Sequence, residues 1–322
     1  MKNGQKVYYY RTYDEDGNRT SGISTGQTTL SAARSYCDKL WKKDELVPKK
    51  STTFVELAED CWVWGKCKYI ARANTYGKKS ISPDHAYTER GYLVNRILPY
   101  FRNYKLTSIK TKVIENYIIS LKAQGELAEG SINHIIKILK IMFAEAKRRD
   151  LIYKDPCENI PYIRSKGKER GILSLEETRL LFTGNALDRV WDNDIVTYTF
   201  HLFSASTGCR RGEILSLKNA NVHKNYVEIT KSFGQISGVK EITKTKESRL
   251  VPIPTITSEW INRIKGDDPE YFLFSKTGGI TPYPPHLVLT LFYKALEKIG
   301  ITSDIRKARN ITFHNDVEEI SI

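Results

Sequence analysis

Hydrophobic positions recur at helical spacing through the first half of the chain. The clearest stretch is 131–149, where apolar residues three and four positions apart share one helix face. This stripe consists of Ile132, Ile135, Ile136, Leu139, Met142, Phe143 and Ala146. Similar spacing predicts three further helices, over 54–61, 92–100 and 113–121. The pattern therefore predicts a helical domain over residues 52–152.

The N-terminal residues show a different pattern, one that is typical of strands. Residues 7–13 are rich in aromatic and β-forming side chains, 16–18 carry a turn signal, and 19–24 can return as a partner strand. A helix is predicted over 30–43. Residues 1–46 are thus expected to form a small sheet with one helix.

Beyond residue 172 the pattern mixes helices with short strands. Ser174 and Glu177 have the spacing of a capping box, which predicts a helix start. A second helix, over 195–206, is expected to end at Gly208, because glycine fits the left-handed conformation just past a helix end. Strands of one small sheet are predicted over 226–230, 238–243 and 249–253, and helices over 257–264 and 285–299.

Linker composition separates these regions. Residues 47–52 form a short linker by composition, and 153–171 combine prolines with a basic run, which favours an extended connection. The expected fold class is a multidomain protein, mainly α with small β-sheets. Its domains are predicted at 1–46, 52–152 and 172–322, with 153–171 as a basic linker.

Charge narrows the class of partner. The 322 residues include 51 Lys and Arg against 37 Asp and Glu, a net charge of +14. Such a surplus favours a polyanionic partner, most commonly nucleic acid, although scattered lysines or an anionic membrane surface would also fit it. No apolar run approaches the ~20 residues that a membrane-spanning helix needs.

Cysteine and histidine usage points to a cytoplasmic protein without a metal centre. Five cysteines form no C-x-x-C pair and are interpreted as reduced thiols. The six histidines are scattered, so no metal site is expected. We also expect no cofactor and no small-molecule ligand.

The stretch 207–217, Thr-Gly-Cys-Arg-Arg-Gly-Glu-Ile-Leu-Ser-Leu, holds the strongest candidate chemistry. Arg210 lies at the junction between a turn and a helix, where its guanidinium can offer two donors to one phosphate. Glu213 follows one helical turn later and could hold Arg210 in place. Taken alone, the pair could also be an ordinary surface ion pair that contributes little.

The whole string resembles the first arginine motif of the tyrosine recombinases, the phage integrase family. A second string, Thr-Lys-Thr-Lys-Glu-Ser-Arg-Leu-Val-Pro-Ile at 243–253, is similar to the family's hairpin with the catalytic lysine, here Lys244. The resemblance covers about 172–314 by motif and 52–161 in pattern only. It implies an arm-type DNA-binding module, a helical core-binding domain and a mixed α+β catalytic domain.

The resemblance implies phosphoryl transfer on DNA without metal or cofactor. A tyrosine would attack a phosphodiester to leave a 3′-phosphotyrosine. Arg210 would stabilise the charge on the phosphate, Glu213 would orient the site, and Lys244 would protonate the leaving 5′-oxygen. His314 takes the histidine position of the family's His-x-x-Arg segment, although a surface histidine near the terminus is an equal interpretation.

The C-terminal residues depart from the family pattern. Val317 stands where the second arginine is expected, and no tyrosine follows Tyr293. We therefore expect a catalytic domain truncated by a frameshift or early stop, with cleavage absent or supplied by a partner.

Basic residues of every region are expected to contact the backbone of double-stranded DNA, with self-association of the chain on DNA. They are Lys6, Arg11, Arg19, Lys137, Lys140, Arg148, Lys166, Lys168, Lys246 and Arg249. For Lys246 and Arg249, solvated charges remain the alternative. The charged loop predicted at 66–82 is a further candidate contact, or simply a mobile loop. The N-terminal module could also be an adaptor that packs on its neighbour.

Two functions follow from these expectations. The first is a site-specific recombinase, a phage integrase-like protein in which cleavage is defective. The second is a non-catalytic, sequence-specific DNA-binding protein derived from an integrase. An RNA-binding or architectural protein would fit the charge but not the motifs at Arg210 and Lys244.

Overall fold

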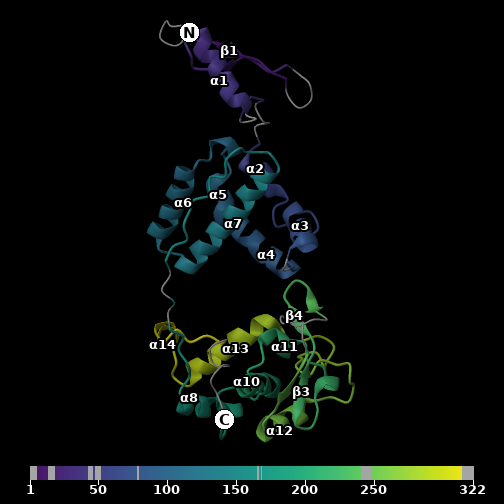
Figure 1. Cartoon of the computed structure of the whole chain (residues 1–322). Helices are drawn as coiled ribbons and strands as arrows, with labels where there is room; N and C mark the ends of the chain where they lie inside the picture. Colours follow the sequence, from purple (N-terminus) through teal and green to yellow (C-terminus); the bar gives the residue numbers. More distant parts are fainter. Residues whose placement is uncertain are drawn as a thin grey trace. The chain divides into compact units, whose positions relative to one another are not determined.

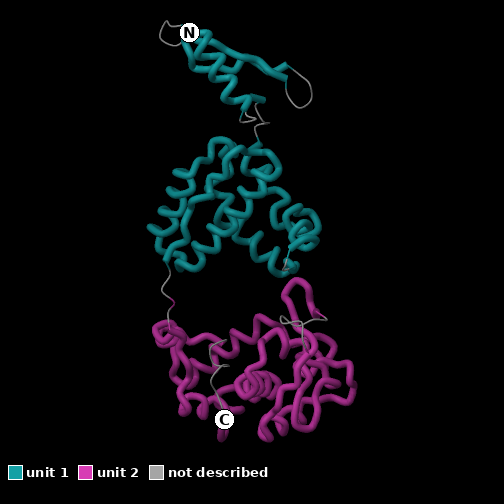
Figure 2. The backbone as a smooth tube through the Cα atoms, viewed as in Figure 1, with its two compact units in different colours: residues 1–165 teal, residues 166–322 magenta. Residues whose placement is uncertain are grey.

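The computed structural model describes residues 6–13, 19–42, 46–47, 52–77, 80–164, 167, 169–240 and 248–313. The chain divides into two compact units, residues 1–165 and 166–322 (Figure 2). Both contain helices, and the strands form small antiparallel pairs (Figure 1). The division between the units falls inside the stretch predicted as a linker. The expected fold class, a multidomain and mainly helical protein with small sheets, is confirmed.

The N-terminal module has the predicted elements in shorter form. Strand β1 (Tyr9–Tyr10) pairs antiparallel with β2 (Ile23–Ser24), and helix α1 (Leu30–Lys42) follows. Among the described residues of this module, Ala33 is the one buried apolar side chain. The module therefore adds nothing to the hydrophobic cores of the two units, and its independence as a domain stays a prediction.

The rest of the first unit is helical and packs around α7 (Figure 1). Its helices are α2 (Phe54–Glu59), α3 (Lys68–Tyr76), α4 (Pro83–Tyr92), the π-helical η1 (Leu93–Ile97), α5 (Leu98–Phe101), η2 (Leu106–Ser108), α6 (Thr111–Gln124) and α7 (Glu129–Arg148). Every apolar residue of the predicted α7 stripe is buried. Phe54 packs its ring against Phe101 and Phe143, at centroid distances of 5.1 and 6.1 Å. The hydrophobic spacing thus predicted this core correctly.

The loop expected at 66–82 is wrong, because helix α3 occupies much of it. Ile70 is buried on its inner face, and Arg72 reaches across to Glu145 on α7. Nine residues with one buried apolar position give too weak a period to be distinguished from a polar loop. Ser82 accepts a hydrogen bond from the His85 amide and caps the next helix, α4.

The second unit surrounds the buried helix α10, which contacts α11, α12 and α13 (Figure 1). Its helices are α8 (Leu175–Phe182), α9 (Ala186–Arg189), α10 (Ile195–Thr207), α11 (Arg211–Leu215), η3 (Asn219–Asn221), α12 (Thr255–Ile264), α13 (Pro285–Lys298) and α14 (Ser303–Ala308). The capping box predicted at α8 is confirmed, since Ser174 and Glu177 exchange hydrogen bonds. Gly208 ends α10 in the left-handed conformation, with φ of +67°, as expected.

The strands of this unit form two sheets rather than one. β3 (Tyr226–Ile229) pairs with β6 (Arg249–Pro252), with Tyr226 opposite Pro252, while β4 (Ser232–Gly234) pairs with β5 (Gly238–Lys240). The prediction of a single sheet is therefore wrong, and β4 was missed. Its three residues, Ser-Phe-Gly, are all half-buried, so they show no alternation that would mark a strand.

Two chemical features of the described residues bear on the earlier expectations. None of their helices has the length and apolar character needed to cross a membrane. Their cysteines Cys37, Cys61, Cys67, Cys157 and Cys209 are free thiols.

Candidate nucleic-acid interface

The turn between α10 and α11 positions Arg210. Gly208 reverses the chain direction, and Arg210 then takes an extended conformation as the residue that precedes α11. Its backbone amide donates to Glu213 Oε2 at 2.9 Å, which satisfies a donor that the start of a helix leaves unpaired. The side chain remains 53% exposed. The backbone of Arg210 is therefore fixed while its guanidinium faces solvent.

Glu213 is the anchor of this site, with only 1% of its side chain exposed. Besides the Arg210 amide, it accepts Arg210 Nη1 at 3.1 Å and a two-pronged contact from Arg249, at 3.0 and 2.7 Å. Burial alone would raise the pKa of Glu213, but the hydrogen bonds from Arg249 and Arg210 outweigh it and hold the pKa below its usual range. Glu213 is therefore a buried carboxylate that stays ionised at neutral pH.

The structure gives Arg249 a different partner from the one expected from the sequence. It was expected to be a phosphate contact or a solvated charge, but its guanidinium holds both oxygens of Glu213 and is 37% exposed. It extends from β6, 36 residues further along the chain. Because of that separation, residue spacing within one element could not predict the pairing of Arg249 with Glu213. The resemblance of 243–253 to the family's hairpin was the only sequence feature that linked Arg249 to the site.

Gly212 allows strand β4 to approach this turn. A Cβ atom at Gly212 would lie 2.8 Å from both the Phe233 carbonyl oxygen and Ser232 Oγ. Glycine therefore permits a contact that any side chain would prevent. The β4–β5 hairpin and the start of α11 consequently form one surface beside Arg210.

Five of the predicted site residues lie outside the described residues. They are Lys166, Lys168, Lys244, Lys246 and His314. Whether Lys244 meets Arg210 at one phosphate therefore stays a prediction, as does the role of His314.

The predicted contacts of the first unit are exposed to different degrees and have protein partners. Lys137 Nζ lies 3.6 Å from the buried Glu89, Lys140 lies over the Tyr162 ring, and Arg148 pairs with Glu145. In the N-terminal module, Lys6, Arg11 and Arg19 are exposed. Their DNA contacts stay predictions.

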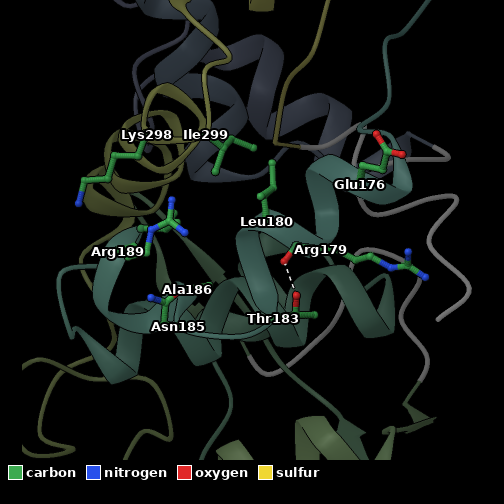
Figure 3. Close-up of a pocket in the computed structure, with 10 residues that line it drawn as sticks. Glu176, Arg179, Leu180, Thr183, Asn185, Ala186, Arg189, Lys298 and Ile299 are labelled. Atoms are coloured by element: carbon green, nitrogen blue, oxygen red, sulfur yellow. Dashed lines mark hydrogen bonds between the residues drawn. The ribbon is translucent and has the colours of Figure 1, made fainter.

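A separate groove of about 570 Å³ lies on the second unit, between α8, α9 and the end of α13 (Figure 3). Arg179, Arg189 and Lys298 give it a basic rim, and Leu180 and Ile299 supply apolar walls. The groove shares no lining residue with the site at Arg210 and Glu213. Within the described part of the chain, no group of His, Cys, Asp and Glu side chains is placed to hold a metal ion.

Comparison with known proteins supports the resemblance to the phage integrases. Residues 75–122 match the family model described as "Phage integrase, N-terminal SAM-like domain". The chain is 26% identical over 197 residues to the ICEBs1 integrase of Bacillus subtilis (strain 168), covering 59% of this chain and 52% of the relative. It is 29% identical over 167 residues to the integrase of Escherichia phage P2, covering 52% and 42%. The chain thus spans about half the length of the curated relatives it matches.

The fold agrees with this relationship. A lambda integrase dimer bound to a COC' core site superposes with a TM-score of 0.60 at 14% identity, covering 98% of this chain and 87% of the other. At that identity the match shows the fold alone, but the sequence relatives and the motif around Arg210 agree with it. The chain therefore resembles the tyrosine recombinases, the phage integrase family, both in sequence and in fold.

Proposed function

We propose that this chain acts on double-stranded DNA as a site-specific recombinase, with Arg210 as the residue that binds the reacting phosphate. The observation that carries this proposal is the half-exposed guanidinium of Arg210 beside a buried, ionised Glu213. One Arg210 nitrogen is committed to Glu213, which leaves the remaining donors for the non-bridging oxygens of a phosphate. The resemblance assigns the same role to the same residue.

The geometry would help catalysis by preorganisation. Negative charge grows on the phosphate as the new bond forms, and a cation already held in position stabilises it without having to reorient. Glu213 fixes the Arg210 side chain, and Arg249 fixes Glu213 from strand β6. Arg210 is thus the proposed catalytic residue, whereas Glu213 and Arg249 are positioning residues.

The remaining steps rest on residues outside the described ranges. Lys244, which precedes β6 in the sequence, is proposed to give a proton to the leaving 5′-oxygen, and His314 to contact the same phosphate. Neither step needs a metal ion or a cofactor. Lys6, Arg11 and Arg19 are proposed to add phosphate contacts from the N-terminal module. Self-association on DNA is proposed because the lambda integrase of similar fold forms a dimer on its core site.

A second candidate is sequence-specific DNA binding without cleavage. Val317 favours it, because an apolar side chain stands where the family places a second arginine. Such a protein would occupy recombination sites and compete with an active integrase.

A suicide DNA substrate, nicked so that religation fails, separates the two candidates. The recombinase proposal predicts a covalent protein–DNA adduct on denaturing gels. Arg210→Lys, which keeps the charge but loses the planar fork, should reduce its formation by roughly 10²–10³-fold. Binding in gel shifts should weaken only a few-fold. Sequence-specific binding without any adduct would favour the second candidate, and equal binding to any duplex would contradict both.

A further inference from the structure

The first unit contains a second buried carboxylate flanked by two arginines. Glu145, on α7, is 3% exposed. Arg148 donates Nε at 2.9 Å to Oε2 and Nη2 at 2.5 Å to Oε1, while Arg72 donates Nη2 at 3.1 Å from α3. The three residues join two helices, at 73 residues of sequence separation for the longer pair.

Glu145 remains charged in this environment. Burial alone would raise its pKa, but hydrogen bonds from Arg148 and Arg72 outweigh that effect and lower the pKa below its usual range. One carboxylate thus faces two guanidinium groups, which leaves the cluster with one uncompensated positive charge. This charge lies at the surface, because Arg72 and Arg148 are 42% and 47% exposed.

The arginines keep donors available for another anion. Arg72 commits Nη2 to Glu145, and its Nε and Nη1 have no hydrogen-bond partner among the described residues. Its guanidinium lies 5.6 Å from the Tyr69 ring centroid, so the ring also restricts its orientation. A fork held in this way loses little freedom when it binds a phosphate.

The surrounding face of α3 suits a nucleic-acid backbone. Lys68, Arg72 and Tyr76 are spaced four residues apart, so they lie along one side of the helix. Lys68 is exposed, and the Tyr76 side chain is 85% exposed. Two cations followed by an exposed aromatic ring form a strip that can contact a phosphate and an adjacent sugar.

We propose that Arg72 and Arg148 form a second phosphate-binding site, which takes one backbone phosphate of duplex DNA. Arg148 braces Glu145, and Arg72 presents its free donors to the phosphate. The proposal rests on the proposed function, because the phosphate would belong to the DNA on which the chain acts. The site reads no base, so its contribution should be the same for every sequence.

A matched pair of substitutions tests the proposal. Arg72 and Arg96 are nearly equally exposed, at 42% and 43%, and each donates once to a glutamate, at 3.1 and 3.2 Å. They differ in the partner, because Glu126 beside Arg96 is 64% exposed and has no second arginine at bonding distance among the described residues. Both substitutions remove one positive charge. Arg72→Gln removes it from the cluster around the buried Glu145, whereas Arg96→Gln removes it from an exposed ion pair.

Fluorescence anisotropy of the full chain with a short random-sequence duplex, repeated over a series of salt concentrations, provides the measurement. Arg72→Gln should lower the affinity roughly tenfold, by about one charged hydrogen bond. It should also reduce the slope of log K against log salt by about 1, as for one lost phosphate contact. Arg96→Gln should leave both quantities near wild type. Circular dichroism should show folded protein, because Arg148 still covers both oxygens of Glu145.

The outcomes separate this proposal from the function on which it rests. If wild type binds the duplex and Arg72→Gln binds with the same affinity and slope, the site is overturned while the proposed function stands. If wild type binds no duplex, both fall together. Should Arg72→Gln unfold, Arg72→Lys keeps the charge without the fork. A several-fold loss of affinity with an unchanged salt slope then supports the site, and wild-type affinity overturns it.

Discussion

The two buried carboxylates, Glu213 in the second unit and Glu145 in the first, divide their arginine partners in the same way. In each cluster one arginine holds both carboxylate oxygens: Arg249 from a distant strand, and Arg148 from the same helix. The bracing arginine thus comes from long-range structure in one unit and from local sequence in the other.

The second arginine of each cluster donates one side-chain hydrogen bond to the carboxylate and presents its other donors to solvent. Arg210 is 53% exposed and Arg72 42%. Burying the carboxylate is costly unless cations compensate it, and two cations overcompensate it by one charge. The arrangement therefore holds a positively charged guanidinium in one orientation at the surface. An arginine without such a partner would lose more side-chain freedom when it binds an anion.

Acid should change the stabilities of the two units by the most different amounts. Among the described residues, only the core of the second unit contains a fully buried histidine. Burial lowers the pKa of His201 to about 3. Its ring stacks on Trp191 at 4.8 Å, and neither ring nitrogen has a hydrogen-bond partner in the described structure. The unfolded chain takes up this proton near pH 6.5, so acid favours unfolding. The free energy of unfolding of the second unit should fall by about 1.4 kcal/mol per pH unit well below pH 6.5, and by about 2.3 kcal/mol in all between about pH 6.5 and 4.5.

His201→Phe should remove this part of the pH dependence and leave the stability at neutral pH little changed, because the orphaned nitrogens disappear. Urea unfolding with pulsed hydrogen–deuterium exchange, read by mass spectrometry, follows peptides of each unit in the full chain. If wild type and variant lose the same free energy of unfolding on acidification, His201 is not the source of the pH dependence.

The bracing arginines give the next largest effect. Arg249→Gln should destabilise the second unit by about 2 kcal/mol, because it leaves Glu213 buried with one side-chain partner. This figure is reduced from that of a fully buried pair, since Arg249 is 37% exposed. Arg210→Gln should cost less, since Arg249 still holds both oxygens. The same unfolding measurement ranks them, and the reverse order would contradict the division into bracing and presenting residues.

The local part of the Glu213 cluster could be predicted from sequence, and the distant parts of both clusters could not. Arg210 and Glu213 lie one helical turn apart, and Gly208 marks the end of the preceding helix, so spacing alone indicated the turn. Arg249 and Arg72 join their carboxylates across 36 and 73 residues. No periodicity within one element encodes such a contact, because it depends on how elements pack.

The secondary-structure predictions succeeded or failed for a similar reason. The seven apolar positions of α7 and the capping box of α8 are strong signals over consecutive residues, and both predictions were correct. Helix α3 and strand β4 are short and bury little, so their patterns were too weak to identify. Their importance comes from what they bring near the two carboxylates, Arg72 in one case and a close backbone contact at Gly212 in the other.

The smallest effect concerns two glycines at equivalent positions, each the second residue of its helix. Gly212 lies in α11 and Gly130 in α7. A Cβ at Gly212 would meet the Phe233 carbonyl oxygen at 2.8 Å, whereas a Cβ at Gly130 would meet nothing within 4 Å. Gly212→Ala should therefore destabilise the second unit by about 1 kcal/mol, because β4 must move away. Gly130→Ala should stabilise the first by about 0.5 kcal/mol, since alanine loses less backbone freedom on folding.

Because the same substitution is made at the same helix position, helix propensity acts equally in both variants, and their difference isolates the approach of β4. Urea unfolding resolved by unit should give opposite signs. If Gly212→Ala moves β4, DNA affinity should also fall a few-fold, because the surface beside Arg210 is displaced, while Gly130→Ala keeps wild-type affinity. Equal stabilisation by both alanines would show that β4 does not depend on the glycine, and the close contact would then have no part in placing Arg210.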